Sequence, residues 1–147
     1  MAEVFGVAAS AIALIELFAK IGVLCSIYCA GVKAAPQDIR NILNEADRCT
    51  ASLRAVERLV TRPNGIKDEN ARNLHRNLET CRTLLDELAV KLEKGTKLGR
   101  LQWPLDKKSV TNVVKKLEQC RSAISLDLQV SQTFVPIAQP PSRLTSC

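Results

Sequence analysis

The sequence is poor in aromatic side chains and in histidine, and these shortages narrow the classes of protein it can be. Aromatic residues make up 3% of the chain, against 46% for hydrophobic residues as a whole, and His75 is the single histidine. The core must therefore be aliphatic, which favours helices, because sheets rely on aromatic and β-branched residues. One tryptophan, Trp103, gives no stacking platform for bases, so a nucleic-acid partner is disfavoured.

Motifs for catalysis and for cofactor binding are missing as well. The segment GTKLGR lacks the spacing of a phosphate-binding loop, and no glycine-rich dinucleotide loop follows a strand. A hydrolytic triad needs a histidine beside a nucleophile and an acid, whereas His75 follows an apolar helix position and is expected to face water. We therefore expect a protein that is not an enzyme, with no cofactor and no small-molecule substrate.

The cysteines do not have the spacing of a metal site. No CxxC pair occurs, and the single histidine is distant from the cysteines in sequence, so a zinc site is not expected. The chain opens without the basic segment and cleavage site of a secretory signal, which indicates a cytoplasmic protein with mostly buried free thiols. The six cysteines are Cys25, Cys29, Cys49, Cys81, Cys120 and Cys147, and the last of these is expected to be exposed.

A long apolar run is present instead, from Val4 to Val32. Its only charges, Glu16 and Lys20, are four residues apart and can pair on one helix face. A helix that is apolar on every side must be surrounded by protein or by lipid, so we expect it to be the central helix of a bundle, a membrane segment, or both in turn. The candidates for membrane insertion are Val4, Phe5, Ile12, Ile15, Phe18 and Ile21, and Phe5, Ile12, Ile15 and Phe18 are expected to be at least partly buried in the resting bundle.

Three further segments repeat apolar residues in steps of three and four, which is typical of helices that pack side by side. The predicted seams are Ile39, Ile42, Ala46, Cys49, Leu53, Val56 and Val60; Ala71, Leu74, Leu78, Cys81, Leu85, Leu88 and Leu92; and Val110, Val113, Leu117, Cys120, Ile124 and Leu128. Gly95 and Asp106 are expected to cap the end of one helix and the start of the next.

These patterns predict an all-α protein, a four-helix bundle with a hydrophobic N-terminal helix. The helices are expected at residues 2–33, 36–61, 68–94 and 106–132, so that the bundle occupies residues 1–132. Residues 133–147 contain Pro136, Pro140 and Pro141 and are expected to form a proline-rich tail or linker.

The net charge of +6 is concentrated in one segment. Residues 91–116 hold eight basic side chains and only two acidic ones, Glu93 and Asp106, which leaves the rest of the chain neutral. Basic residues near an anionic membrane each contribute about 1 kcal/mol of attraction, and a tryptophan suits the membrane interface. The expected basic patch consists of Lys91, Lys94, Lys97, Arg100, Trp103, Lys107, Lys108, Lys115 and Lys116, and we expect it to hold the bundle at an anionic membrane while the first helix inserts.

Three stretches resemble the N-terminal domains of fungal NOD-like receptors and their relatives, the SesA and HeLo-like group. They are the apolar start MAEVFGVAASAIALIELFAKI, the proline-led segment APQDIRNILNEADRCTASLRAVERLV, and LGRLQWPLDKKSVTNVVKKLEQCRSAISLDLQ with its Trp-Pro pair before a basic helix. Together they cover most of residues 1–129. The Trp-Pro pair with its following helix is the most specific of the three.

The resemblance implies a helical bundle that acts in programmed cell death or heterokaryon incompatibility, recruited from the cytoplasm to the plasma membrane. In the HeLo-like branch a triggered bundle is thought to release its N-terminal helix into the membrane, with self-association on activation. The chain departs from the family pattern because no nucleotide-binding module and no amyloid-forming tail is evident, so the sensor would lie on another chain or beyond Cys147. The alternative is a soluble adaptor that binds other helical domains or itself without membrane activity.

Overall fold

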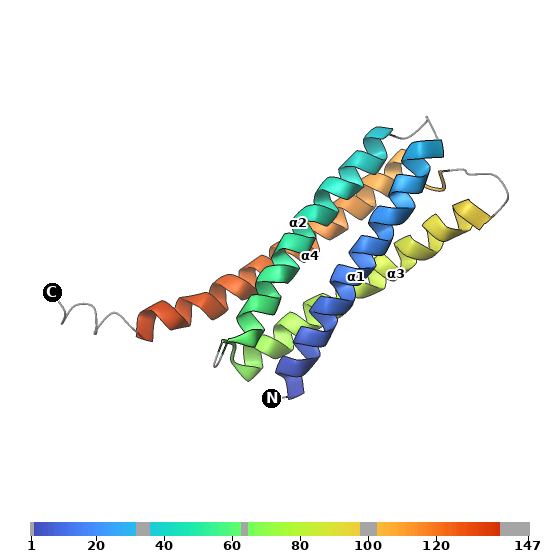
Figure 1. Cartoon of the computed structure of the whole chain (residues 1–147). Helices are drawn as coiled ribbons and strands as arrows, with labels where there is room; N and C mark the ends of the chain where they lie inside the picture. Colours follow the sequence, from blue (N-terminus) through green and yellow to red (C-terminus); the bar gives the residue numbers. More distant parts are fainter. Residues whose placement is uncertain (1, 32–35, 63–64, 98–102, 139–147) are drawn as a thin grey trace.

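The computed structural model describes residues 2–31, 36–62, 65–97 and 103–138, and these form four helices without any strand (Figure 1). The helices are α1 (Ala2–Gly31), α2 (Pro36–Thr61), α3 (Asp68–Lys97) and α4 (Lys107–Ala138). They pack against one another along their length, which confirms the predicted all-α four-helix bundle with an apolar N-terminal helix.

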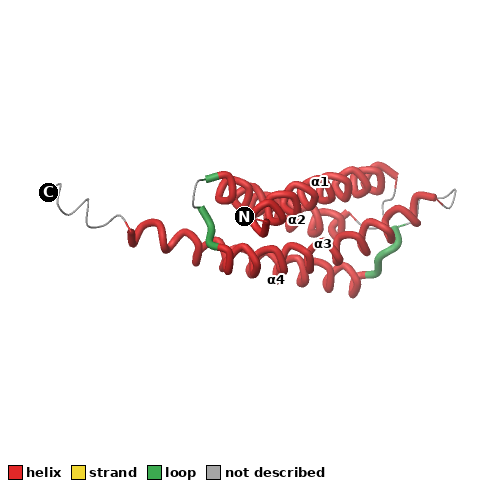
Figure 2. The backbone as a smooth tube through the Cα atoms, turned by 90° about the horizontal axis from the view of Figure 1, so that it is seen from below, coloured by secondary structure: helices red, strands yellow, loops and turns green. Residues whose placement is uncertain are grey.

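Each helix has two neighbours, so the bundle is a ring. α1 packs against α2 and α3, and α4 packs against the same two helices, while α1 and α4 do not touch within the described residues. Figure 2 shows this as two layers, with α1 beside α2 in one and α3 beside α4 in the other. α1 and α4 therefore occupy diagonally opposite corners.

The prediction that α1 is the central helix is wrong. Helices of the same diameter pack with their axes about 8–10 Å apart, and at that spacing three helices are too few to enclose a fourth. The stable solution for four helices of similar length has no central position. One side of α1 consequently remains at the surface.

The core follows the predicted seams closely. All seven seam residues of α3 are buried, and on α2 the prediction fails only at its end, where Leu59 is buried in place of Val60. On α4, Val113 and Cys120 are only half-buried, because this helix leaves more open space along its contact with α3. The spacing of apolar residues therefore identified the inward faces of three helices.

Helix ends were predicted less well than helix interiors. α2 has the predicted bounds, and residues 32 and 33 of the first predicted helix lie outside the described residues. α3 continues three residues beyond its predicted end, so Gly95 is a buried helical residue and not the expected cap. A glycine is compatible with a helix interior where a neighbouring segment packs closely, and its sequence signal is then misleading.

The start of α4 is capped as predicted. The Asp106 Oδ1 atom accepts a hydrogen bond of 2.7 Å from the Ser109 backbone N–H, and the Asp106 carbonyl accepts one of 3.0 Å from Val110. The bonds from Ser109 hold the pKa of Asp106 below its usual range. The cap satisfies backbone groups that would otherwise lack a partner at a helix start.

α4 runs six residues past its predicted end at 132 and includes Pro136, a residue that had indicated the tail. A proline lacks only its own N–H, so the backbone bond it removes is the one to the carbonyl four residues earlier. The final turns extend beyond the other helices (Figure 1). The remaining residues of the predicted tail, 139–147, lie outside the described residues.

Candidate functional site: the outer face of α1

α1 carries two apolar stripes on opposite faces. The inner stripe follows steps of three and four and is buried throughout, and it consists of Val7, Ala11, Leu14, Phe18, Ile21, Cys25 and Tyr28. These side chains pack against α2 and α3. Their burial is sufficient to hold α1 in the bundle, since each large apolar side chain contributes about 1.5–3 kcal/mol when removed from water.

The second stripe, which we call the outer stripe, faces away from the bundle with a similar periodicity. It consists of Phe5, Ala9, Ile12, Glu16, Ala19, Val23, Ile27 and Ala30, all exposed. Phe5 is 74% exposed and Val23 62%, although both are large apolar residues. Glu16 is the stripe's one ionisable residue. A row of exposed apolar side chains of this kind, interrupted here only by Glu16, is typical of a site of contact with a protein or a membrane.

The candidates for membrane insertion divide between these two faces. Phe5 and Ile12 lie on the outer stripe, whereas Phe18 and Ile21 are buried, so they cannot meet lipid while the bundle is folded. The expectation that Phe5 is at least partly buried at rest is wrong, because it is 74% exposed on the side of α1 that has no neighbouring helix, whereas Ile12 on the same side is 46% exposed and so partly covered. The other two candidates, Val4 and Ile15, lie between the two faces and are half-buried.

Lys20 is held by α3 rather than by its own helix. Its Nζ atom lies 2.6 Å from the Glu93 Oε1 atom on α3, and its side chain is 54% exposed. The sequence had suggested a pair with Glu16, four residues earlier on the same face. Because the Lys20 side chain points towards α3, it does not cover the outer stripe. The stripe residues on either side of Glu16 therefore form a narrow apolar surface.

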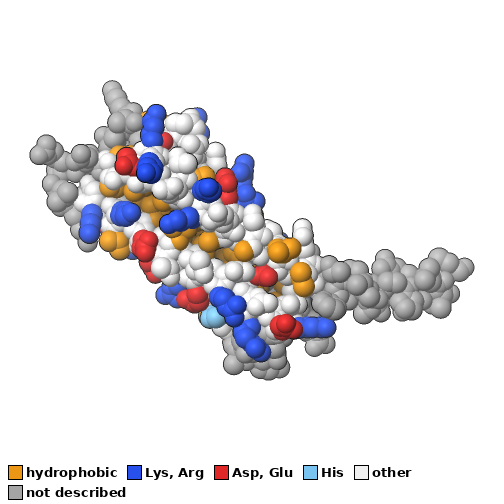
Figure 3. All heavy atoms as spheres, turned by 180° about the vertical axis from the view of Figure 1, so that it is seen from behind, with side chains coloured by type: hydrophobic (Ala, Val, Ile, Leu, Met, Phe, Trp, Pro, Cys, Tyr) orange, Lys and Arg blue, Asp and Glu red, His pale blue; other side chains and the backbone are white. Residues whose placement is uncertain are grey.

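The basic patch surrounds α4. Lys107 and Lys115 line the groove between α2 and α4, whereas Lys91 and Lys116 line the space between α3 and α4. Lys108 is exposed on the first turn of α4 and Lys94 near the end of α3. In Figure 1, α4 lies behind α2. Figure 3 shows the molecule from behind, with Lys and Arg side chains spread over this rear face and apolar side chains between them.

The outer stripe and the lysines of α4 therefore lie on opposite sides of the bundle. α1 and α4 are diagonal in the ring, and the outer stripe points away from both of the neighbours of α1. A flat membrane cannot touch both surfaces of the folded bundle at once. The expectation that the basic patch holds the bundle on a membrane while the first helix inserts therefore requires α1 to leave the bundle, and it stays a prediction.

Trp103 packs into the protein. Its ring meets the Tyr28 ring edge-on, with centroids 5.1 Å apart and planes at 82°. The Tyr28 hydroxyl donates a hydrogen bond of 2.5 Å to the Leu92 carbonyl of α3. The segment before α4 is thus tied to the ends of α1 and α3. Of the remaining predicted patch residues, the Lys97 side chain and the whole of Arg100 lie outside what the structure describes.

A polar cluster that sequence reasoning missed lies between α1 and α3. The Ser10 hydroxyl donates to the Glu79 Oε1 atom at 3.3 Å and lies 3.5 Å from the His75 Nδ1 atom, and His75 Nε2 is 3.8 Å from the same Glu79 oxygen. His75 is thus half-buried against α1 and does not simply face water. A hydrolytic triad has the imidazole between the hydroxyl and the acid, whereas here the hydroxyl bonds the acid directly. The cluster ties two helices together.

An ion pair between a buried carboxylate and a partly exposed arginine joins α2 to α4. Glu45 is 2% exposed, and its Oε1 atom accepts a bond of 2.7 Å from the Arg121 Nε atom, with Arg48 3.6 Å from its other oxygen. The adjacent groove of about 740 Å³ mixes acidic and basic side chains, including Asp38 and Lys107. This balance of charge gives no preference for an anionic ligand. Among the described residues, no group of three histidine, cysteine or acidic side chains could hold a metal ion.

By length and composition, residues Val4–Ala30 of α1 could cross a membrane, and this is the one such segment in the described part of the chain. The core helix of a soluble protein has the same properties, so the exposed outer stripe is the more informative observation. The chain matches no protein-family model, no curated protein and no solved structure. Function must therefore be argued from these surfaces.

Proposed function

We propose that this chain is a helical signalling or effector domain of the kind found at the N-terminus of fungal NOD-like receptors, and that it associates with membranes through α1. The observation that supports this proposal is the outer stripe, which is apolar and exposed in the folded bundle. Release of α1 is not needed for a first contact with lipid. Programmed cell death is the process in which such a domain would act.

The geometry favours a helix that lies in the membrane surface during this first contact. An interfacial helix buries one apolar face to a shallow depth and keeps its other face away from the lipid. Phe5, Ile12, Val23 and Ile27 each gain up to about 1.5–3 kcal/mol from full transfer out of water. Glu16 stays near the headgroups in this orientation, which avoids the cost of placing a charge in the bilayer centre.

The lysines around α4 do not take part in this contact, because they face the other way. They remain in solvent, where they can attract a second anionic surface. Membrane association through the outer stripe is accordingly expected on neutral and anionic lipid alike, with little dependence on salt. Association through the lysines would need anionic lipid and would fall as salt rises.

The decisive experiment is flotation of the protein with neutral and with anionic liposomes. The Ile12→Asp variant should lose binding to both, because it removes a large apolar side chain from the stripe and adds a second carboxylate one turn from Glu16. Val90→Asp on α3 is the matched control, since Val90 is also an exposed apolar residue and each change places a carboxylate four residues from an existing one. Val90→Asp should bind as the wild type does.

A variant with glutamate in place of Lys107, Lys108, Lys115 and Lys116 shows whether the outer stripe or the lysines around α4 bind the membrane. Binding that survives this reversal supports contact through the outer stripe. If the reversal abolishes binding and Ile12→Asp does not, the lysines around α4 form the membrane surface and the proposal is wrong. Dye leakage from the same liposomes, and the growth of fungal cells expressing each variant, then test whether association damages membranes.

A soluble adaptor is the second candidate function, and the composition of the outer stripe favours it. Small residues, Ala9, Ala19 and Ala30, are interspersed among larger ones along a helical spacing, which is typical of surfaces where another helix packs closely. In that case the wild type should not float with any liposome. It should instead form a complex with itself or with another helical domain, measured by light scattering, that Ile12→Asp disrupts and Val90→Asp does not.

A further inference from the structure

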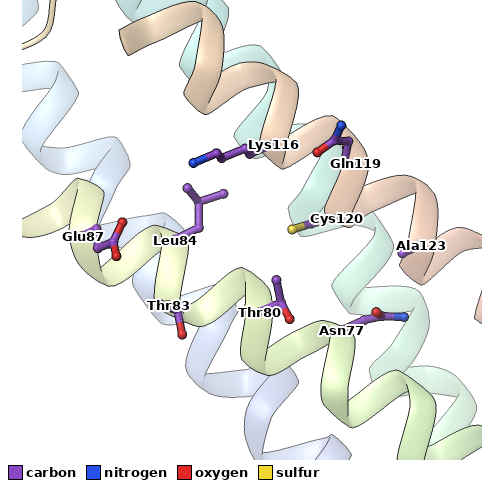
Figure 4. A pocket seen from close by; sticks show the side chains of 9 residues that line it. All are labelled: Asn77, Thr80, Thr83, Leu84, Glu87, Lys116, Gln119, Cys120 and Ala123. Carbon is purple, nitrogen blue, oxygen red and sulfur yellow. The ribbon is translucent and has the colours of Figure 1, made fainter.

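A groove between α3 and α4 exposes a cysteine that the sequence had placed in the core. The groove has a volume of about 540 Å³ and is open to solvent. Figure 4 shows the Cys120 sulfur pointing from α4 into the space between the two helices, near Thr80 on α3, while Lys116 lines the same groove one turn away along α4. Cys120 is half-buried, so small molecules can reach its sulfur.

A second cysteine lies directly behind it. Cys81 on α3 is 1% exposed, and its side chain lies within hydrogen-bonding reach of the Cys120 side chain. Hydrogen bonding between the two thiols favours a negative charge on Cys120 and lowers its pKa, while the same interaction and burial raise the pKa of Cys81. The two thiols are thus unequal: one is accessible and easily ionised, and the other is covered and holds its proton.

The other buried cysteines lack these properties. Burial raises the pKa of Cys25 to about 11 and that of Cys49 to about 12. Cys49 donates a weak hydrogen bond of 3.7 Å to the Leu117 carbonyl, and it is not among the residues that line the groove. Because the thiolate is the reactive form of cysteine, both should be inert. Cys29 is exposed but has no cysteine in a neighbouring helix that the structure places beside it.

We propose that Cys120 and Cys81 form a peroxide-reactive dithiol, in which Cys120 is the site of attack and Cys81 resolves the product. The groove admits hydrogen peroxide to Cys120, and the second sulfur lies within hydrogen-bonding reach. The product is a disulfide that joins α3 to α4. This proposal is independent of membrane association, because neither residue lies on α1.

The chemistry is balanced with hydrogen peroxide as the oxidant. The Cys120 thiolate attacks one peroxide oxygen, so an S–O bond forms, the O–O bond breaks, and the second oxygen leaves as hydroxide and takes up a proton to become water. Cys120 is now a sulfenic acid, oxidised by two electrons. Oxidation consumes the Cys120 thiolate, whose hydrogen bond is the largest cause of the raised pKa of Cys81, so Cys81 can now release its proton. The Cys81 sulfur attacks the Cys120 sulfur, an S–S bond forms, and the sulfenic oxygen leaves with that proton as a second water.

Peroxide treatment of the folded 147-residue chain, followed by alkylation of free thiols and peptide mapping, tests the proposal. The wild type should lose two thiols and yield the peptide pair linked through Cys81 and Cys120. The Cys49→Ser variant is the matched control, because it alters a third buried cysteine of the same core, and it should give the same linked pair. Cys120→Ser should give none.

The Cys81→Ser variant traps the intermediate. Without a resolving thiol, Cys120 should remain as a sulfenic acid and react with dimedone, and Cys81→Ala gives a second form of this test if the serine disturbs the core. Circular dichroism confirms that each variant is folded. The proposal is overturned if the wild type forms no Cys81–Cys120 link, or if peroxide modifies Cys29 while Cys120 stays unlabelled in both Cys81 variants.

Discussion

α1 and α3 are equally long helices that pack against each other, yet they present opposite kinds of surface to their surroundings. Each has 30 residues and buries a regular inner stripe. The exposed side of α3 carries charged side chains such as Arg72, Arg82 and Asp86, whereas that of α1 carries the outer stripe. Water solvates the first surface well and the second poorly.

This difference between the exposed faces of α1 and α3 shows which apolar residues are needed for folding and which are not. The inner stripes suffice to hold both helices in the bundle, as α3 shows with a polar outer surface. Nothing in the packing of α1 requires large apolar residues at Phe5 or Val23, which are mostly exposed. A surface that is unnecessary for folding and unfavourable in water is a candidate for contact with a partner. The predictions below test this separation of inner and outer faces.

The largest effects on stability should come from the inner stripes of the two helices alike. Leu14→Ala in α1 and Leu78→Ala in α3 remove side chains that are 0% exposed, and each should lower the free energy of unfolding by about 2–5 kcal/mol. Leu117→Ala on α4 should do the same. Urea unfolding followed by circular dichroism measures the loss. Values below about 0.5 kcal/mol at Leu14 and Leu78 would mean that these residues are not in the core.

A smaller effect is expected where the end of α1 is tied to α3. Tyr28→Phe removes the hydroxyl that bonds the Leu92 carbonyl and keeps the ring that meets Trp103. The free energy of unfolding should fall by about 1 kcal/mol, a typical net value for one hydrogen bond. Tryptophan fluorescence should be nearly unchanged in the folded state, because the contact between the rings remains. A large spectral shift would show that the hydroxyl, and not the ring, positions Trp103.

A still smaller effect is expected at the ion pair between α1 and α3. Lys20→Met keeps the apolar stem and removes the charge that meets Glu93, and because Lys20 is more than half exposed, stability should change by less than about 1 kcal/mol. The change should shrink as salt is added, since salt screens exposed charges. Unfolding curves at low and high salt provide the measurement. An effect independent of salt would contradict a role for the charge.

The smallest effect on stability is expected on the outer stripe, where the effect on function should be largest. Ile12→Asp should change the free energy of unfolding by no more than about 0.5 kcal/mol, as is usual for surface positions, and Val90→Asp on α3 should do likewise. Both residues are about half exposed in the bundle. A severe loss of stability at Ile12 alone would show that the outer stripe helps to hold α1 in place.

Much of the fold could be read from residue spacing, because a repeat of three and four has one inward face whatever the partner is. The seven seam residues of α3 and the bounds of α2 are examples. Local signals were weaker guides: Gly95 lies inside a helix, and α4 continues through Pro136. Whether a glycine or proline ends a helix depends on what packs around it, and the residue type alone does not predict that packing.

The sequence predicted the components of the candidate site but not how they are arranged in space. The apolar character of residues 4–32 and the cluster of lysines are visible in the sequence, but their placement on opposite sides of the bundle is not. Partnerships between helices were also hidden, such as Lys20 with Glu93 and Cys120 with Cys81. These pairs are far apart along the chain, so no spacing rule connects them.

By itself, the sequence determined that this protein is built from helices with an aliphatic core, since apolar periodicity and low aromatic content are properties of the chain alone. Only the tertiary structure decided which helices are neighbours. α1 is apolar on every side, so its composition is compatible with a central, a membrane-spanning or a corner position. The ring of four helices gives it two neighbours and leaves its outer stripe exposed, because four helices of equal width have no centre to occupy.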